Sequence, residues 1–197
     1  MLYGYLGDIA FNKIAYEYIL ANASKRENAN FLGNNLPQFL QASNHCKHNP
    51  EIFELASLEV AINKAFVAPE TNFATSSEFI DSKKQTIKIK FVESAQFLLF
   101  NQNTTSIWAA LKCGEKPPRP HSLEAPQNVL VWRQRGTSRF RIFGDEEATL
   151  FQLFANKASL KSAAKSLAPK IGQELALQRT TTYLRGWLEA ELIAAPV

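Results

Sequence analysis

The sequence predicts an α+β fold, in which a mostly helical N-terminal part precedes a small winged-helix-like module with a hairpin, three helices and a terminal strand. Apolar residues in the first 70 positions recur at helical spacing, which indicates amphipathic helices. Two alternating segments on either side of Gly136-Thr137 indicate a β-hairpin, and helical patterns follow it. A proline-rich stretch separates the two patterns.

That proline-rich stretch marks the predicted domain boundary. Residues 117–127 contain four prolines, and proline lacks an amide donor and fixes φ. We therefore predict a linker between an N-terminal domain of residues 1–116 and a C-terminal domain of residues 128–197. The net charge of +4 lies wholly in the C-terminal domain, which carries ten basic and six acidic side chains. This surplus permits an acidic partner.

The composition is that of an ordinary globular protein. The 197 residues are 46% hydrophobic and 20% charged, and the mean hydropathy is -0.19. No apolar run approaches the roughly 18 residues that a membrane span needs, and the N-terminus lacks the pattern of a signal peptide. Two cysteines make no disulfide framework. We expect a cytoplasmic protein.

Helices dominate the N-terminal domain. Asp8 can cap a helix that extends to about residue 23, and Pro37 suits the first turn of a short helix over 36–42. The other expected elements are a helix over 51–68, strands over 86–91 and 95–100, and a helix from 103 to about 114.

The helix over 51–68 has the clearest apolar face. Leu55, Leu58 and Ile62 recur at helical spacing, and Glu59 falls between them. A carboxylate in an apolar stripe is costly unless it is paired. Glu59 therefore either pairs with a Lys, an Arg or a backbone amide of this chain, or helps to fix an interface with another protein.

The hairpin, formed by 128–135 and 138–143, is expected to have one core face and one basic face. The core face would hold Leu130, Trp132, Phe140 and Ile142. The basic face would hold Val131 with Arg133, Arg135, Arg139 and Arg141.

Three helices and a strand are expected after the hairpin. Acidic residues after Gly144 favour the start of the first helix, because they complement its dipole. The second and third helices are expected over 159–168 and about 171–191, with Leu177, Leu184 and Leu188 facing inward from the third, and residues 192–197 as the last strand.

Catalytic motifs are missing from the sequence. It contains no G-x-S-x-G, P-loop, G-x-G-x-x-G or H-E-x-x-H pattern. His45, Cys46 and His48 could form half of a zinc site, but no second pair with ligand spacing exists. We expect this chain to be neither an enzyme nor a metal-binding protein.

Two kinds of partner fit the C-terminal domain. In a winged-helix DNA-binding protein the third helix would read DNA with Arg179 and Arg185, although Glu174 and Glu189 make its charge mixed. An extended acidic peptide suits the basic hairpin equally well, because such a peptide can add a strand to a sheet edge.

Several segments, in the right order, resemble the HvfC/BufC family. They are Leu55–Phe66, similar to its L-A-x-L-E-x-A-x-x-x-A-F helix, Ser106–Trp108, similar to its I-W segment, Leu130–Arg133, similar to its L-V-W-R strand, and 160–167 and 183–193, similar to its closing helices. The resemblance covers about residues 50–193. The short region before the matching helix resembles the methanobactin branch of the family.

The resemblance implies a role beside an enzyme. Family members pair with a TIM-barrel, multinuclear non-heme iron enzyme, and the pair modifies a ribosomally made precursor peptide. In the methanobactin branch, an MbnB-like enzyme uses O₂ to convert cysteines of an MbnA-like precursor into oxazolone and thioamide groups, and the product chelates copper. The iron and the catalytic residues belong to the enzyme. Another ribosomal peptide product is the alternative, whereas membrane or nucleic-acid binding is not implied.

The resemblance and the residue pattern together predict two surfaces. The leader segment of the precursor is expected to bind Val131, Arg133, Arg139, Arg141, Arg179 and Tyr183. The enzyme is expected to contact Leu55, Glu59 and Trp108, with simple core packing as the alternative for Trp108. No catalytic or metal-binding residue is assigned to this chain.

Overall fold

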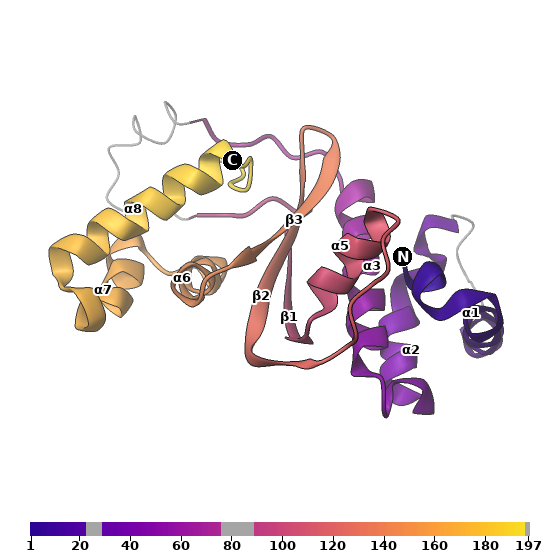
Figure 1. Ribbon diagram of the computed structural model, residues 1–197. Helices are drawn as coiled ribbons and strands as arrows, with labels where there is room; N and C mark the ends of the chain where they lie inside the picture. The colour runs from indigo at the N-terminus through magenta and orange to yellow at the C-terminus, as the bar shows by residue number, and fades with distance from the viewer. Residues whose placement is uncertain (23–28, 76–88, 196–197) are drawn as a thin grey trace.

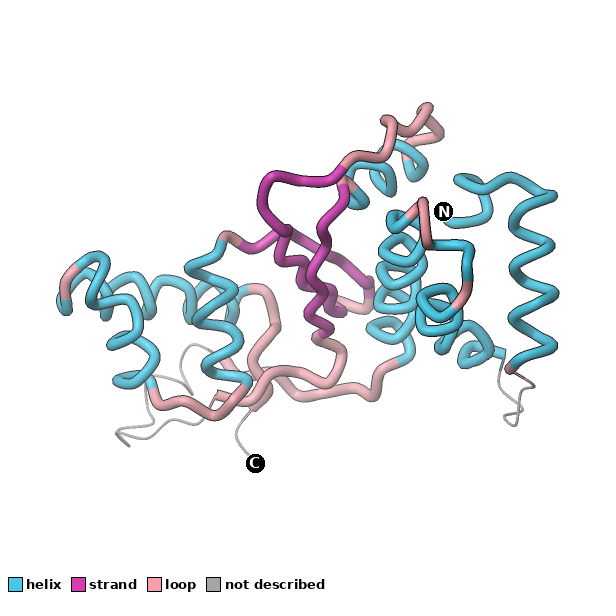
Figure 2. Tube along the Cα trace, turned by 90° about the horizontal axis from the view of Figure 1, so that it is seen from below, coloured by secondary structure: helices cyan, strands magenta, loops and turns pink. Residues whose placement is uncertain are grey.

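The computed structural model describes residues 1–22, 29–75 and 89–195 and confirms the α+β class. A three-stranded antiparallel sheet forms the central layer (Figure 1). The N-terminal helices cover one of its faces, and the C-terminal helices lie on the other side (Figures 1 and 2). None of the described helices is both long and apolar enough to cross a membrane.

The N-terminal layer contains α1 (Leu2–Ala21), α2 (Leu36–Ala42) and α3 (Pro50–Val67), with short 3₁₀ helices at Ala29–Asn35 and Asn44–Cys46. The predicted bounds of α2 and α3 are confirmed. The first helix begins before Asp8 and bends at Gly7, whose φ of +73° suits glycine. Leu2, Ile14 and Tyr18 are its buried residues, whereas Ile9 is 90% exposed.

The sheet consists of β1 (Gln96–Gln102), β2 (Ser122–Gln134) and β3 (Thr137–Phe143), in the order β1-β2-β3. Helix α5 (Thr104–Lys112) connects β1 to the loop before β2. The predicted hairpin, the strand over 95–100 and the helix from 103 to about 114 are thereby confirmed.

The expected linker over 117–127 is corrected in its second half. Residues 122–127 belong to β2, and they pair with β1 from Gln102↔Ser122 to Phe100↔Gln127. Pro126 is tolerated in this strand because it lies beside the register shift between Phe100 and Gln102, where the ladder is already interrupted. One sheet therefore contains strands from both sides of the predicted boundary.

The expected faces of the hairpin are also corrected. The two-residue turn at Arg135-Gly136 pairs Gln134 with Thr137, so even-numbered residues of β2 lie opposite odd-numbered residues of β3. One face consequently carries Leu130 and Trp132 with Arg139 and Arg141, and the other carries Val129, Val131 and Arg133 with Phe140 and Ile142. The structure has no single basic face on this hairpin.

The C-terminal layer contains α6 (Asp145–Ala155), α7 (Leu160–Ile171) and α8 (Gln173–Glu189). Trp187 of α8 is fully buried and contacts several aromatic rings, among them Phe151 and Phe143. The indole Nε1 of Trp132 donates to the carbonyl of Ala190 at 2.8 Å, which ties the hairpin to the end of α8.

The two remaining predicted strands are described only in part. Phe91 pairs with Ile193 and Phe73 pairs with Ala194, each as an isolated bridge. The rest of the strand predicted over 86–91 lies largely outside the described residues, as do residues 196–197. The C-terminal tail thus joins the segments around 73 and 91.

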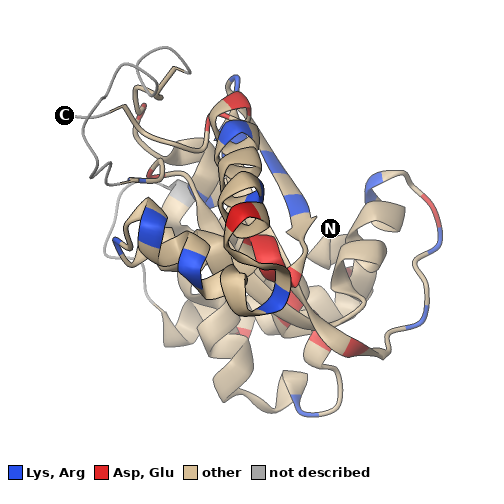
Figure 3. Cartoon of the chain, turned by 90° about the vertical axis from the view of Figure 1, so that its left-hand side faces the viewer, with Lys and Arg blue, Asp and Glu red and all other residues tan. Residues whose placement is uncertain are grey.

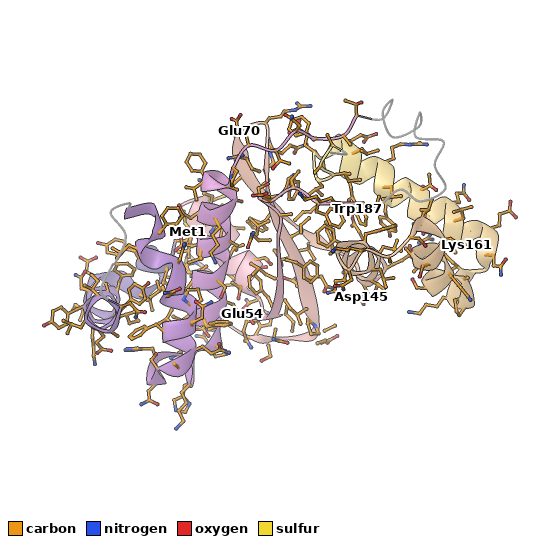
Figure 4. All side chains as sticks on the ribbon, turned by 180° about the vertical axis from the view of Figure 1, so that it is seen from behind. Met1, Glu54, Glu70, Asp145, Lys161 and Trp187 are labelled. Carbon is orange, nitrogen blue, oxygen red and sulfur yellow. The ribbon has the colours of Figure 1, made fainter. Side chains whose placement is uncertain are left out.

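A separate apolar core forms on each face of the sheet. On the N-terminal side, Leu58 and Ala61 of α3 pack on Val129 and Val131. On the C-terminal side, Leu130 and Trp132 pack on α6, α7 and α8. A third cluster joins α1, α2 and α3. Met1 and Glu54 accordingly lie on the opposite side of the sheet from Trp187 (Figure 4).

Candidate functional site

Strand β3 is an edge of the sheet, and its outer side is open. Hydrogen-bonded and non-hydrogen-bonded pairs alternate in an antiparallel ladder, and a two-residue turn is closed by a hydrogen-bonded pair. The backbone groups of Ser138, Phe140 and Ile142 therefore point away from β2. Arg133, opposite Ser138, obeys the same alternation, because its amide points away from β3 and donates to Ser94. None of the three outward residues makes a backbone hydrogen bond across the edge to a described residue.

The other edge strand, β1, is blocked at one end by the side chain of Glu54. This carboxylate is 4% exposed and accepts from the amides of Asn101 and Gln102, at 2.7 and 3.1 Å. It also accepts from the hydroxyl of Thr104 at 2.6 Å, at the start of α5. The β-bulge at the same place interrupts pairing. The open β3 edge is therefore the better template for an added strand.

The sequence interpretation overlooked Glu54. Glu54 lies on the same helical face as the buried Leu58, Ala61 and Ala65, at i+4, i+7 and i+11. That spacing was a usable signal that the carboxylate is buried. Its donors come from the end of β1 and the start of α5, about 50 residues away, which no local pattern reveals.

Replacing Glu54 with Ala is expected to lower the free energy of unfolding by about 2 kcal/mol. The change leaves the buried Gln102 amide and Thr104 hydroxyl without an acceptor, whereas Asn101 is exposed and can bond to water. Urea unfolding of the full chain measures this value. Glu54→Gln keeps one acceptor and should lose less, and equal losses for the two variants would contradict the hydrogen-bond explanation.

An apolar pocket of about 380 Å³ lies at the start of the β3 edge. Thr137 and Ser138 form one wall, and Ile62, Phe66 and Trp108 form much of the rest. Trp108 also contacts Phe140 edge-to-face, with ring centroids 5.0 Å apart. The buried Nε1 of Trp108 has no hydrogen-bond partner among the described residues. A strand added to β3 would find this pocket on one of its two faces.

The three residues predicted to contact the enzyme lie in different environments: one is in the core and two line the pocket. Leu55 is fully buried between helices, so it supports the fold. Glu59 lines the pocket at the start of β3, and it accepts hydrogen bonds from the amino terminus of Met1 and from the amide of Leu2. Glu59 thus has partners within the chain, which was one of the two interpretations. Trp108 is half-buried in the same pocket.

Two of the predicted leader-binding residues point away from the open edge. Val131 is fully buried under α3. Arg133 donates to the carbonyls of Phe66 and Pro69, at 2.8 and 2.9 Å, and thereby caps the end of α3. Both residues lie on the sheet face opposite Arg139 and Arg141, as the pairing across the two-residue turn requires.

The partly exposed Arg141 pairs with a buried carboxylate. Its guanidinium donates twice to Glu147, at 2.6 and 3.1 Å, and lies over the ring of Phe143, 4.4 Å from the centroid. Glu147 is 5% exposed and also accepts from Trp187 Nε1 at 2.8 Å. This bidentate geometry fixes α6 against β3 and α8. The sequence interpretation missed Glu147, although it noted the acidic start of this helix.

Arg179 and Tyr183 lie beside that pair on α8. Arg179 contacts both oxygens of Glu146 at 3.4 Å. Burial, and then the neighbouring carboxylate of Glu146, raises the pKa of the Tyr183 phenol. The structure therefore brings together Arg141, Arg179 and Tyr183, but acids of α6 pair with both arginines.

Arg139 differs from the other predicted arginines. Its side chain is exposed on β3 and makes no ion pair or hydrogen bond with a described residue. It lies next to the outward-facing backbone of Phe140. An added strand would thus have Arg139 on one face and the pocket with Trp108 on the other.

The half zinc site considered for His45, Cys46 and His48 has no further ligands among the residues that the structure describes. His45 Nε2 lies 2.8 Å from a carboxylate oxygen of Glu17. No described group of three or more His, Cys, Asp or Glu side chains is placed to hold a metal ion. Burial raises the pKa of the Cys46 thiol, which disfavours the thiolate needed for metal binding.

Comparisons with known proteins gave no evidence on function, so a function proposed for this chain rests on the geometry described above. A scan against protein-family models gave no match, and a search of curated proteins gave none.

Proposed function

We propose that this chain is the MbnC-like, non-catalytic subunit of a cytoplasmic heterodimer with an MbnB-like iron enzyme. In this proposal the β2–β3 hairpin and α6–α8 act as a winged-helix-like module that recognises the leader segment of a precursor peptide. The observation that carries the proposal is the open β3 edge, where the backbone groups of Ser138, Phe140 and Ile142 point outward and form no backbone hydrogen bond with a described residue. The resemblance to the HvfC/BufC family supports it.

Strand addition would supply both affinity and orientation. Main-chain hydrogen bonds to the three outward residues hold an extended segment whatever its sequence. Side chains on one face of that segment would meet the pocket with Phe66 and Trp108. Side chains on the other face would meet Arg139, whose unpaired charge favours an acidic residue there.

The proposed division of labour leaves the chemistry to the partner. The TIM-barrel enzyme would hold the iron ions and use O₂ to oxidise cysteines of the precursor to oxazolone and thioamide groups. This chain would hold the leader, so that the cysteine-containing segment reaches the enzyme at high effective concentration. The product would be the copper chelator methanobactin, or another modified ribosomal peptide if the precursor differs.

Co-expression with an MbnB-like enzyme and a labelled leader peptide tests the proposal. We expect the two proteins to elute together at one-to-one stoichiometry, and the fluorescence anisotropy of the leader to rise on addition of the complex. Peptide modification should require both proteins. If purified chain alone modified a cysteine peptide, or if duplex DNA bound with steep salt dependence while the leader did not, the proposal would be wrong.

A further inference from the structure

A groove of about 990 Å³ lies between α7 and α8, on the C-terminal side of the sheet. Leu160, Ala164 and Ala168 of α7 form a row along it, and Leu177 of α8 lies opposite. Residues four apart form one row on a helix, so the three positions on α7 extend for about 12 Å, or two turns. The small alanines allow another backbone to approach closely.

Leu177 is more exposed to solvent than its place in the helical pattern predicts. The helical pattern places it with Leu184 and Leu188 in the core, but it is 49% exposed, whereas Leu184 is buried. The neighbouring Leu175 is 42% exposed as well. The exposed fraction of Leu177 belongs to the wall of the groove. The apolar surface of α8 thus extends beyond the core that its own fold covers.

The positive charge of the C-terminal domain gathers beside this groove. Lys157, Lys161, Lys165 and Lys170 lie in or next to α7, and basic bands follow this helix in Figure 3. None of the four forms an ion pair with an acid that the structure describes. By contrast, Arg135, Arg141 and Arg179 are paired with glutamates. Lysines without a described acidic partner are therefore displayed along α7, while Glu174 of α8 adds one negative charge to the groove.

We propose that the α7–α8 groove docks an acidic amphipathic helix of a partner protein. A helix with apolar residues at i and i+4 would place them against the row of Leu160 and Ala164, as in other helix-in-groove complexes. Carboxylates on the α7 side of that apolar stripe would meet Lys161 and Lys165, which line the same groove, whereas Glu174 lines it from α8 and favours a neutral or basic residue there. This docking surface is separate from β3, and it does not depend on leader binding there.

The apolar floor distinguishes this partner from other anionic ones. Nucleic acid is held mainly by contacts between its phosphates and basic side chains, and these contacts do not require a row of leucine and alanine below the lysines. An anionic membrane needs apolar side chains that project outward, whereas Ala164 is 7% exposed at the bottom of the groove. Both become outcomes that the test can report.

The test uses a designed probe and the full chain. The probe is a fluorescein-labelled helix of about 18 residues, with leucines at i and i+4 on one face, glutamates on one flank and glutamines on the other. We expect saturable binding by fluorescence anisotropy. The double variant Lys161→Glu/Lys165→Glu should bind about tenfold more weakly, because two attractions become repulsions. Leu177→Gln should weaken binding without changing any charge.

Matched controls separate this docking from general charge attraction. The variant Lys112→Glu/Lys116→Glu changes the net charge equally at exposed positions near α5, and it should bind the probe like the unmodified chain. Circular dichroism checks that each variant is folded. The proposal is overturned if the probe does not bind, if a polyglutamate of equal charge binds as tightly, or if duplex DNA or phosphatidylglycerol vesicles bind more tightly and show the same dependence on Lys161 and Lys165.

Discussion

Replacing Ile142 with Pro should weaken leader binding about tenfold, whereas Ile142→Ala should change it by less than about threefold. Both variants replace the isoleucine side chain, which is 47% exposed. Only proline also removes the amide that points toward the open edge of β3. The loss of one main-chain hydrogen bond, worth about 1 kcal/mol, and the local stiffening of the strand account for the tenfold effect.

This pair of variants is informative because the fold should survive both. The amide of Ile142 is not part of the ladder with β2, and proline is tolerated on edge strands where its nitrogen faces outward. Arg141→Pro is the contrasting variant, since the amide of Arg141 points toward β2 and its loss should unfold the hairpin. If Ile142→Ala weakened leader binding as much as Ile142→Pro, the side chain rather than the strand edge would hold the peptide.

Replacing Glu147 with Ala should lower the free energy of unfolding by about 3 kcal/mol, which is the largest stability effect that we expect. The change removes the acceptor of the buried Trp187 Nε1 and leaves a cavity between α6 and α8. Arg141 loses its bidentate partner, but its side chain is 44% exposed and can be solvated, so this part of the loss is small. Urea unfolding provides the measurement.

The neighbouring Glu146 is the matched control for Glu147. Its contact with Arg179 is longer, at 3.4 Å, and both side chains are partly exposed. Glu146→Ala should therefore cost no more than about 1 kcal/mol. If both substitutions cost the same, general repulsion among charges rather than the buried contact with Trp187 would govern this cluster.

Local pattern was sufficient to predict most helices and the hairpin, because caps, prolines and apolar spacing act over a few residues. The helix α3 begins at Pro50, as the sequence indicated, and the turn includes Gly136 but lies at Arg135-Gly136, one residue before the expected Gly136-Thr137. The faces of the hairpin were wrong for a geometric reason. A two-residue turn pairs positions of opposite parity, so Arg139 shares a face with Trp132 and not with Arg133.

The candidate site was harder to predict, because it depends on contacts between distant segments. No local signal shows that Arg133 caps α3 or that Glu147 neutralises Arg141. The surplus charge of the C-terminal domain follows from the sequence, but only the structure shows that Arg135, Arg141 and Arg179 are paired with glutamates, whereas Arg139 and the lysines of α7 form no ion pair with a described residue. Strand order in the sheet, which makes β3 an open edge, is likewise a property of the whole fold.

Amide hydrogen exchange of the complex, with and without the leader peptide, tests the central claim most directly. The account predicts that the leader slows exchange at the outward-facing amides of Ser138, Phe140 and Ile142, while the amides of Arg139 and Arg141, already bonded to β2, change little. A bound leader that leaves the exchange of all three outward amides unchanged would contradict it.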